Sequence, residues 1–101
     1  MKLKEVTGIS EQVRKRVYAR DSFDDWPCCI RCGSPYHIEI HHFVERSRGG
    51  MGIEENLVCL CAYCHSKLHN GDRSVRDFCE EYLKAEYPGW EESKVIYRRQ
   101  N

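Results

Sequence analysis

The sequence has no excess of charge of either sign and no long apolar run. Its 101 residues contain 16 Lys and Arg and 16 Asp and Glu, so its formal net charge is zero. No global positive field therefore attracts nucleic acid or an anionic membrane, and any such partner must be held locally. The N-terminal residues lack the apolar segment of a signal peptide, and no run is long enough to cross a bilayer. We expect a cytoplasmic protein with no membrane partner.

Internal repeats and low-complexity segments are absent as well. Because 101 residues suffice for about one domain, we expect residues 1–101 to form a single domain.

Cysteine, in contrast, is abundant, with seven in the chain. Four of them form two Cys-x-x-Cys pairs, Cys29 with Cys32 and Cys61 with Cys64. In a reducing compartment such pairs favour thiolate–metal bonds over disulfides. Four thiolates suit a tetrahedral, structural Zn²⁺ ion and leave no open position for a substrate. We predict such a zinc knuckle, with four unligated buried or paired cysteines as the alternative.

The other three cysteines have different expected places. Cys28 offers a second register with Cys32, although the glycine after Cys32 makes Cys29 the more natural partner. Cys59 and Cys79 are expected in the core, because free cysteine is among the most buried residue types.

The apolar spacing predicts an α+β fold. Ile9, Val13 and Val17 recur at four-residue steps, with Ser10 as a candidate N-cap. Alternating residues and loop glycines predict a β-hairpin, and a helical pattern with apolar residues from Val75 to Leu83 follows it. The tail from Trp90 fits either a short helix or an extended strip. The predicted elements are a helix over about 10–20, strands over 37–44 and 57–60, and helices over 61–70 and about 74–87.

Four of the five histidines are candidate metal ligands or catalytic groups. His65 and His69 are four residues apart, so they share one helix face. His41 and His42 end the first strand. If the hairpin packs on the helix, His41 joins His65 and His69 around a divalent cation and leaves coordination positions open for water and a phosphate oxygen. An isolated histidine is usually a surface or satisfied core residue, but four at these spacings favour a catalytic metal site.

The HNH nuclease motif is similar to two runs of this chain, IHHFVERSRGG at 40–50 and ENLVCLCAYCHSKLH at 55–69. The resemblance covers about residues 28–70. It implies a ββα-metal (His-Me finger) core with a four-cysteine zinc knuckle, flanked by an N-terminal and a C-terminal helix. The helix from Val75 to Leu83, together with residues 87–90, resembles, more weakly, the tails of small phage-type HNH proteins. Many family members have two aliphatic residues and a proline where this chain has Phe43-Val44-Glu45, but this departure touches no ligand position.

The resemblance also implies residue roles. His42 takes the part of the general base, Asn56 is the motif's middle residue that ties the loop between the strands, and Glu39 resembles a supporting acidic residue. The implied activity is a metal-dependent DNA endonuclease that nicks or cuts both strands. Its catalytic divalent ion would be Mg²⁺, Mn²⁺, Ni²⁺ or Zn²⁺. The implied ligands of this ion are His41, His65 and, as in the colicin-type branch, His69.

Double-stranded DNA is then the expected partner, and its phosphates need basic contacts. Residues 1–20 carry six basic and two acidic groups, so the local excess of positive charge lies in the first helix. A merely solvated helix face is an equal alternative for that helix. The residues expected to contact phosphates are Arg14, Lys15, Arg16, Arg20, Arg46, Arg48 and Lys67.

Two other functions fit parts of the sequence. A non-catalytic zinc-ribbon module that binds DNA or protein explains the cysteines but leaves the histidines unused. A colicin-type toxin explains the histidines but is carried on a delivery module, which we do not expect here. The favoured expectation is a free-standing phage or mobile-element endonuclease in the bacterial cytoplasm, a monomer or weak dimer, with phage packaging proteins among its expected partners.

Overall fold

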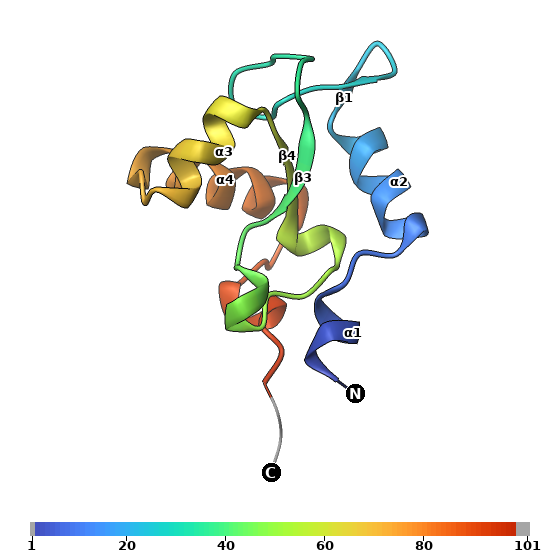
Figure 1. Cartoon of the computed structure of the whole chain (residues 1–101), viewed down its shortest axis with the longest axis vertical. Coiled ribbons are helices and arrows are strands. Elements are labelled where there is room, and N and C mark those ends of the chain that lie inside the picture. The colour runs from blue at the N-terminus through green and yellow to red at the C-terminus, as the bar shows by residue number, and fades with distance from the viewer. Residues whose placement is uncertain (1, 99–101) are drawn as a thin grey trace.

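A two-stranded antiparallel hairpin lies at the centre of the protein, seen here as a computed structural model that describes residues 2–98. The strands are β3 (Glu39–His42) and β4 (Leu57–Leu60), with His41 opposite Val58 and His42 opposite Leu57. Successive residues of a strand point to opposite faces of the sheet. The register therefore sends the two histidines to opposite faces, and helices cover both faces (Figure 1).

One face of the hairpin packs against α2 (Glu11–Arg20). Val17 of this helix is fully buried and forms a small core with Leu57 and Cys59. The Ser10 side chain caps the helix by accepting a hydrogen bond from the backbone N–H of Val13. The predicted helix and its cap are thus confirmed.

The opposite face packs against α3 (Ala62–His69) and α4 (Arg73–Glu86), which lie together on the other side of the hairpin from α2 (Figure 1). Residues from β4 and both helices form the larger core there. The α4 helix buries Val75, Cys79 and Leu83 as its periodicity predicts, whereas Phe78 remains 40% exposed. The predicted α+β architecture, with limited strand content, is confirmed.

Several short elements were not expected from the sequence. An N-terminal helix, α1 (Leu3–Thr7), precedes α2, and a small hairpin of β1 (Ser22–Phe23) and β2 (Trp26–Pro27) follows it. The prediction of a strand over 37–44 was too long. His37 has a left-handed backbone (φ 54°), and after His42 the chain leaves the ladder to enter the inter-strand loop. That loop contains two 3-10 turns, Arg46–Arg48 and Glu54–Asn56.

The C-terminal tail combines both predicted forms. Residues Glu92–Val95 form a 3-10 turn, and Ile96 then pairs with Gly50 in an antiparallel bridge. Gly50 has no room for a side chain, because a Cβ there would stand 1.7 Å from the carbonyl oxygen of Val44. The part of the predicted tail at 99–101 lies outside the described residues. None of the described helices is long and apolar enough to span a membrane.

Candidate functional site

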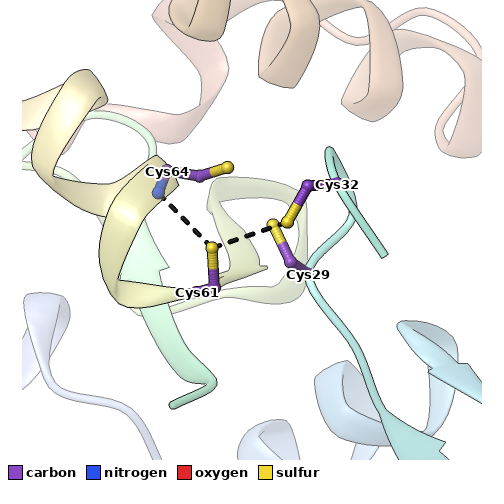
Figure 2. Close-up of side chains that lie close together, drawn as sticks. All are labelled: Cys29, Cys32, Cys61 and Cys64. Atoms are coloured by element: carbon purple, nitrogen blue, oxygen red, sulfur yellow. Dashed lines mark hydrogen bonds between the residues drawn. The ribbon is translucent and has the colours of Figure 1, made fainter. Parts of the chain in front are cut away.

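The four cysteines of the predicted zinc knuckle converge from two segments. Cys29 and Cys32 lie in the loop after β2, while Cys61 and Cys64 lie at the start of α3 (Figure 2). Their sulfur atoms all lie within 4.8 Å of one another, with 3.6 Å between those of Cys32 and Cys61. A tetrahedral zinc ion with Zn–S bonds of about 2.3 Å places its sulfurs about 3.8 Å apart. The cluster therefore fits one structural Zn²⁺ ion.

Backbone geometry explains how the knuckle forms. The backbone N–H of Gly33 donates to the Cys29 carbonyl, and glycine suits the turn because its φ is 78°. Burial raises the pKa of the Cys29 thiol, but backbone hydrogen bonds at Cys32, Cys61 and Arg31 outweigh it and bring the pKa to about 7. A thiolate, which zinc requires, is thus readily formed at this position.

The remaining cysteines stand apart from the cluster. The Cys28 thiol donates to the carbonyl oxygen of Trp26 at 3.3 Å, so the structure favours the register that uses Cys29. Cys59 and Cys79 are fully buried, as predicted. Burial raises the pKa of each of these two thiols to about 12, which keeps them protonated and suits them to packing.

Beside the knuckle, a cleft of about 370 Å³ gathers the four candidate histidines. Their side chains come from the end of β3 and from the length of α3. Three arginines and a single carboxylate also line it, so charge in the cleft is mainly positive. The residues lining the cleft are His41, His42, Phe43, Glu45, Arg46, Arg48, His65, Leu68, His69, Gly71 and Arg76.

The neighbouring histidines of β3 have different partners. His41 faces α3, where its ring stacks on that of His65 with centroids 3.5 Å apart and planes 10° apart. Burial, with smaller effects of His65 and His42, lowers the pKa of His41 to about 4. His42 faces the N-terminal segment, and its Nε2 lies 2.7 Å from the carbonyl oxygen of Thr7. Burial and Arg46 lower the pKa of His42, while the Thr7 carbonyl opposes them.

The three predicted ligands of a catalytic ion, His41, His65 and His69, share the cleft but do not converge on one point. Among the described residues, the four cysteines form the group whose ligand atoms all lie within 4.8 Å. Imidazole binds a metal ion in the plane of its ring. Two parallel rings 3.5 Å apart have no shared in-plane point, so an ion held by both His41 and His65 requires one ring to turn. Neutral imidazoles nevertheless suit Zn²⁺ or Ni²⁺ chemically.

Asn56 is a fully buried side chain that ties the inter-strand loop. Its amide nitrogen donates to the carbonyl oxygens of Val44 (3.1 Å) and Met51 (2.9 Å), and its amide oxygen accepts from the N–H of Val44 (2.8 Å). Asn56 thereby fixes the backbone that follows the histidine pair. Glu39, in contrast, is exposed at the start of β3 and does not line the cleft.

The arginine at position 20 does not lie on an open surface, contrary to what we expected of a phosphate contact. Its side chain is only 12% exposed and forms a bidentate ion pair with the fully buried carboxylate of Asp21. It also donates to the carbonyl oxygens of Glu54 and Leu57 and to the hydroxyl of Tyr87. Because its donors are used inside the protein, Arg20 links α2 to the hairpin.

The other predicted basic residues divide between the two faces of the hairpin. Arg46 and Arg48 line the cleft. The rest are paired or exposed on helices: Arg14 pairs with Glu11, Arg16 with Glu54 and Lys67 with Asp72, while Lys15 is exposed. The α2 helix covers the face of the hairpin opposite α3 (Figure 1). The basic residues of α2 therefore lie away from the cleft.

Two functional groups at the site were not expected from the sequence: Arg76, which lines the cleft, and the Thr7 carbonyl, which contacts His42. Arg76 of α4 reaches the cleft, with its guanidinium carbon 4.5 Å from the centre of the Phe43 ring and an ion pair to Glu92. Its position next to Val75 on a helix gave only a weak signal. The Thr7 carbonyl gave none, because a backbone acceptor has no sequence signature.

Comparison with known proteins agrees with this architecture. A hairpin followed by a helix, with histidines on both and a four-cysteine cluster at the junction, defines a metal-finger domain. Residues 29–71 match the family model described as HNH endonuclease. The chain thus contains an HNH endonuclease domain over these residues.

Two individual proteins are similar to parts of the chain. One is the type IV methyl-directed restriction enzyme EcoKMcrA of Escherichia coli (strain K12), 42% identical over 43 residues, which are 43% of this chain and 15% of that protein. The other is anaredoxin of Nostoc sp., 37% identical over 35 residues, which are 35% of this chain and 46% of that protein. The chain spans less than half the length of each.

Proposed function

We propose that this protein is a metal-dependent DNA endonuclease that hydrolyses phosphodiester bonds. The observation that carries the proposal is the cleft itself, where four histidines and three arginines surround about 370 Å³ beside the cysteine cluster. The match to HNH endonucleases covers the hairpin and α3, the elements that supply all four histidines. We also propose that the whole chain acts as one domain, because α2 and α4 each share a core with the hairpin.

Phosphodiester hydrolysis needs a base for the attacking water and compensation for charge that grows on the phosphate. His42 is proposed as the base, because a neutral imidazole accepts a proton near neutral pH and His42 is one of the residues that line the cleft. Arg46, Arg48 and Arg76 provide positive charge for the phosphate, against the one carboxylate of Glu45.

His41, His65 and His69 are proposed to hold the catalytic divalent ion. When bound there, the ion would polarise the phosphate and stabilise the leaving oxygen. Three imidazoles favour Zn²⁺ or Ni²⁺ over Mg²⁺, which prefers oxygen ligands. Asn56 is proposed to act indirectly, by holding the loop after the histidine pair in place. Glu39, at the start of β3, is proposed only for a supporting role.

Double-stranded DNA is the proposed substrate, with Arg46 and Arg48 as its nearest phosphate contacts. Arg14, Lys15, Arg16 and Lys67 are proposed as outer contacts, because they lie outside the cleft. The phage or mobile-element origin, the bacterial cytoplasm as location and a monomer or weak dimer belong to this proposal and rest on the resemblance.

A non-catalytic zinc-ribbon DNA-binding module is the second candidate. It is favoured by the closed cysteine cluster, which by itself needs no chemistry, and by the stacked His41 and His65 rings. The two candidates differ in whether the histidines act on DNA.

The experiment is to incubate zinc-loaded protein with supercoiled plasmid and added Mg²⁺, Mn²⁺, Ni²⁺ or Zn²⁺. We expect metal-dependent nicked or linear DNA with 5′-phosphate ends, and a loss of about 10²- to 10⁴-fold in rate for His42→Ala. The matched control is His37→Asn, which changes the one histidine outside the cleft and keeps a residue type that tolerates its left-handed backbone. Cutting that survives His42→Ala would refute the role of His42, and binding without cutting under every metal would favour the zinc-ribbon module.

A further inference from the structure

The hydrogen bond between His42 and Thr7 joins the cleft to a segment far outside the HNH match. Thr7 ends α1, whereas the match begins at residue 29. The Nε2 atom of His42 lies 2.7 Å from the Thr7 carbonyl oxygen. A carbonyl oxygen only accepts hydrogen bonds, so Nε2 must carry the proton. In a neutral ring the lone pair then lies on Nδ1.

We propose that the N-terminal segment 3–8 is a positioning element that holds His42 in the tautomer with its proton on Nε2, leaving Nδ1 to take the proton of water. The inference rests on the proposed role of His42 as the base. Among the described residues, no hydrogen bond engages Nδ1 of His42, and His42 is one of the residues that line the cleft. In general, a hydrogen bond made by one ring nitrogen of a histidine fixes the tautomer and so determines that the other nitrogen reacts.

The Thr7 carbonyl is available because α1 ends there. The last carbonyl groups of a helix have no partner within the helix, so they accept hydrogen bonds from elsewhere. Thr7 is only 2% exposed, and its hydroxyl donates to the carbonyl oxygen of Leu3 at 2.9 Å. Arg46, which lines the cleft, in turn donates from Nε to the Thr7 hydroxyl oxygen at 3.3 Å. Thr7 therefore touches two residues of the cleft, each through a different group.

The segment is held in place by direct backbone contact with the inter-strand loop. The N–H of Gly52 donates to the Val6 carbonyl oxygen at 3.0 Å. A Cβ on Gly52 would stand 2.0 Å from the carbonyl oxygen of Gly8. Only glycine fits at position 52 while the segment keeps this place. Substitution of Gly52 is thus a way to displace the segment without touching His42.

The test is the tautomer of His42 in solution. Zinc-loaded full-length protein with ¹⁵N-labelled histidine is studied by long-range ¹H–¹⁵N correlation NMR at pH 8, above the ordinary histidine pKa of about 6.5. We expect a protonated Nε2 and an unprotonated Nδ1 for His42. In Gly52→Ala and in a chain lacking residues 2–8, we expect a mixture of tautomers.

The kinetic counterpart is a fall in kcat with little change in KM for plasmid DNA. We expect a fall between about tenfold and 10⁴-fold, the upper figure being what a wrong histidine tautomer costs a serine protease. Thr7→Val keeps the carbonyl and removes the hydroxyl, so it should keep the tautomer. Gly89→Ala is the glycine control, because nothing lies within 4 Å of its added Cβ. Its φ of 82° strains an alanine there, a cost that Gly52, whose φ is not positive, does not carry, so the control is the more demanding of the two for the backbone.

Two results would overturn the inference. A proton on Nδ1 of His42 in the unaltered protein does so directly, even if both variants fail to fold. The inference is also overturned if a folded Gly52→Ala variant keeps both the tautomer of His42 and the kcat of the unaltered protein. If the unaltered protein shows the expected tautomer but cuts no DNA, the nuclease proposal fails while the contact between segment 3–8 and His42 stands.

Discussion

The rings of His41 and His65 stack face to face, with their centroids 3.5 Å apart and their planes within 10° of parallel. This contact joins β3 to α3, and both residues line the cleft. Metal ligation by both residues requires the stack to open, since each ring binds an ion within its own plane. The stack thus defines the rearrangement that an ion at His41, His65 and His69 would bring about.

The first prediction concerns this metal site. We expect zinc-loaded protein to bind one additional Ni²⁺ ion per chain, and His41→Ala and His65→Ala to weaken that binding by about tenfold or more. Calorimetric titration measures the affinity. His37→Asn should bind Ni²⁺ as the unaltered protein does, because His37 lies outside the cleft. Equal affinity in all four proteins would show that the cleft histidines do not hold the ion.

The second prediction separates neighbouring cysteines. Cys29→Ser should lose zinc and its cooperative thermal transition, because zinc binding of about 10–16 kcal/mol is comparable to or larger than the whole stability of a small domain. Cys28→Ser should keep one zinc per chain, since its sulfur lies outside the cluster. Zinc content by mass spectrometry and unfolding by circular dichroism are the measurements. Retention of zinc in Cys29→Ser with loss in Cys28→Ser would reverse the register.

A third prediction tests Asn56 as the tie of the inter-strand loop. Asn56→Ala should destabilise the protein by about 3 kcal/mol, because it removes the partners of two buried backbone groups of Val44 and of the partly buried carbonyl of Met51. Asn70→Ala is the control, because Asn70 is exposed at the end of α3 and should change stability by less than about 0.5 kcal/mol. Urea unfolding measures both. Equal stability of the two variants would contradict the role of Asn56.

The fourth prediction distinguishes a structural arginine from a DNA contact. Arg20→Gln should cost about 3–5 kcal/mol, since it leaves the buried carboxylate of Asp21 without its ion partner. Arg14→Gln, on the same helix, should cost less than about 0.5 kcal/mol, because its pair with Glu11 is exposed. Urea unfolding measures both variants. If Arg20→Gln unfolds at the same urea concentration as the unaltered protein and only weakens DNA binding, the structural role of Arg20 is wrong.

The fifth prediction locates the DNA surface. In a His42→Ala background that prevents cutting, Arg46→Gln with Arg48→Gln should reduce the slope of log K against log salt by about 2, one for each phosphate contact. Arg14→Gln with Lys15→Gln removes the same charge from the opposite face of the hairpin and should change the slope less. Fluorescence anisotropy with a labelled duplex measures the slope. Equal reductions would place DNA on both faces.

Local spacing in the sequence determined a good part of the fold. The span Leu57–Leu60, the cap at Ser10 and the helical spacing of His65 and His69 depend on residues near one another in the chain, and the structure has them as predicted. The convergence of the two cysteine pairs was predictable too. Four cysteines that bind one zinc ion must lie close together in the fold, even when the two pairs are distant in the chain.

What only the tertiary structure decided are contacts between segments distant in the chain. Arg20 looks like any basic residue on an exposed helix, and its burial follows from packing against Asp21, Leu57 and Tyr87. Likewise, the pairing register points the side chains of His41 and His42 in opposite directions, so that His41 meets His65 and His42 meets the Thr7 carbonyl although both residues line the cleft. The Thr7 carbonyl reaches His42 through the backbone, and every residue has a carbonyl, so no side-chain pattern marks the one that a histidine will meet.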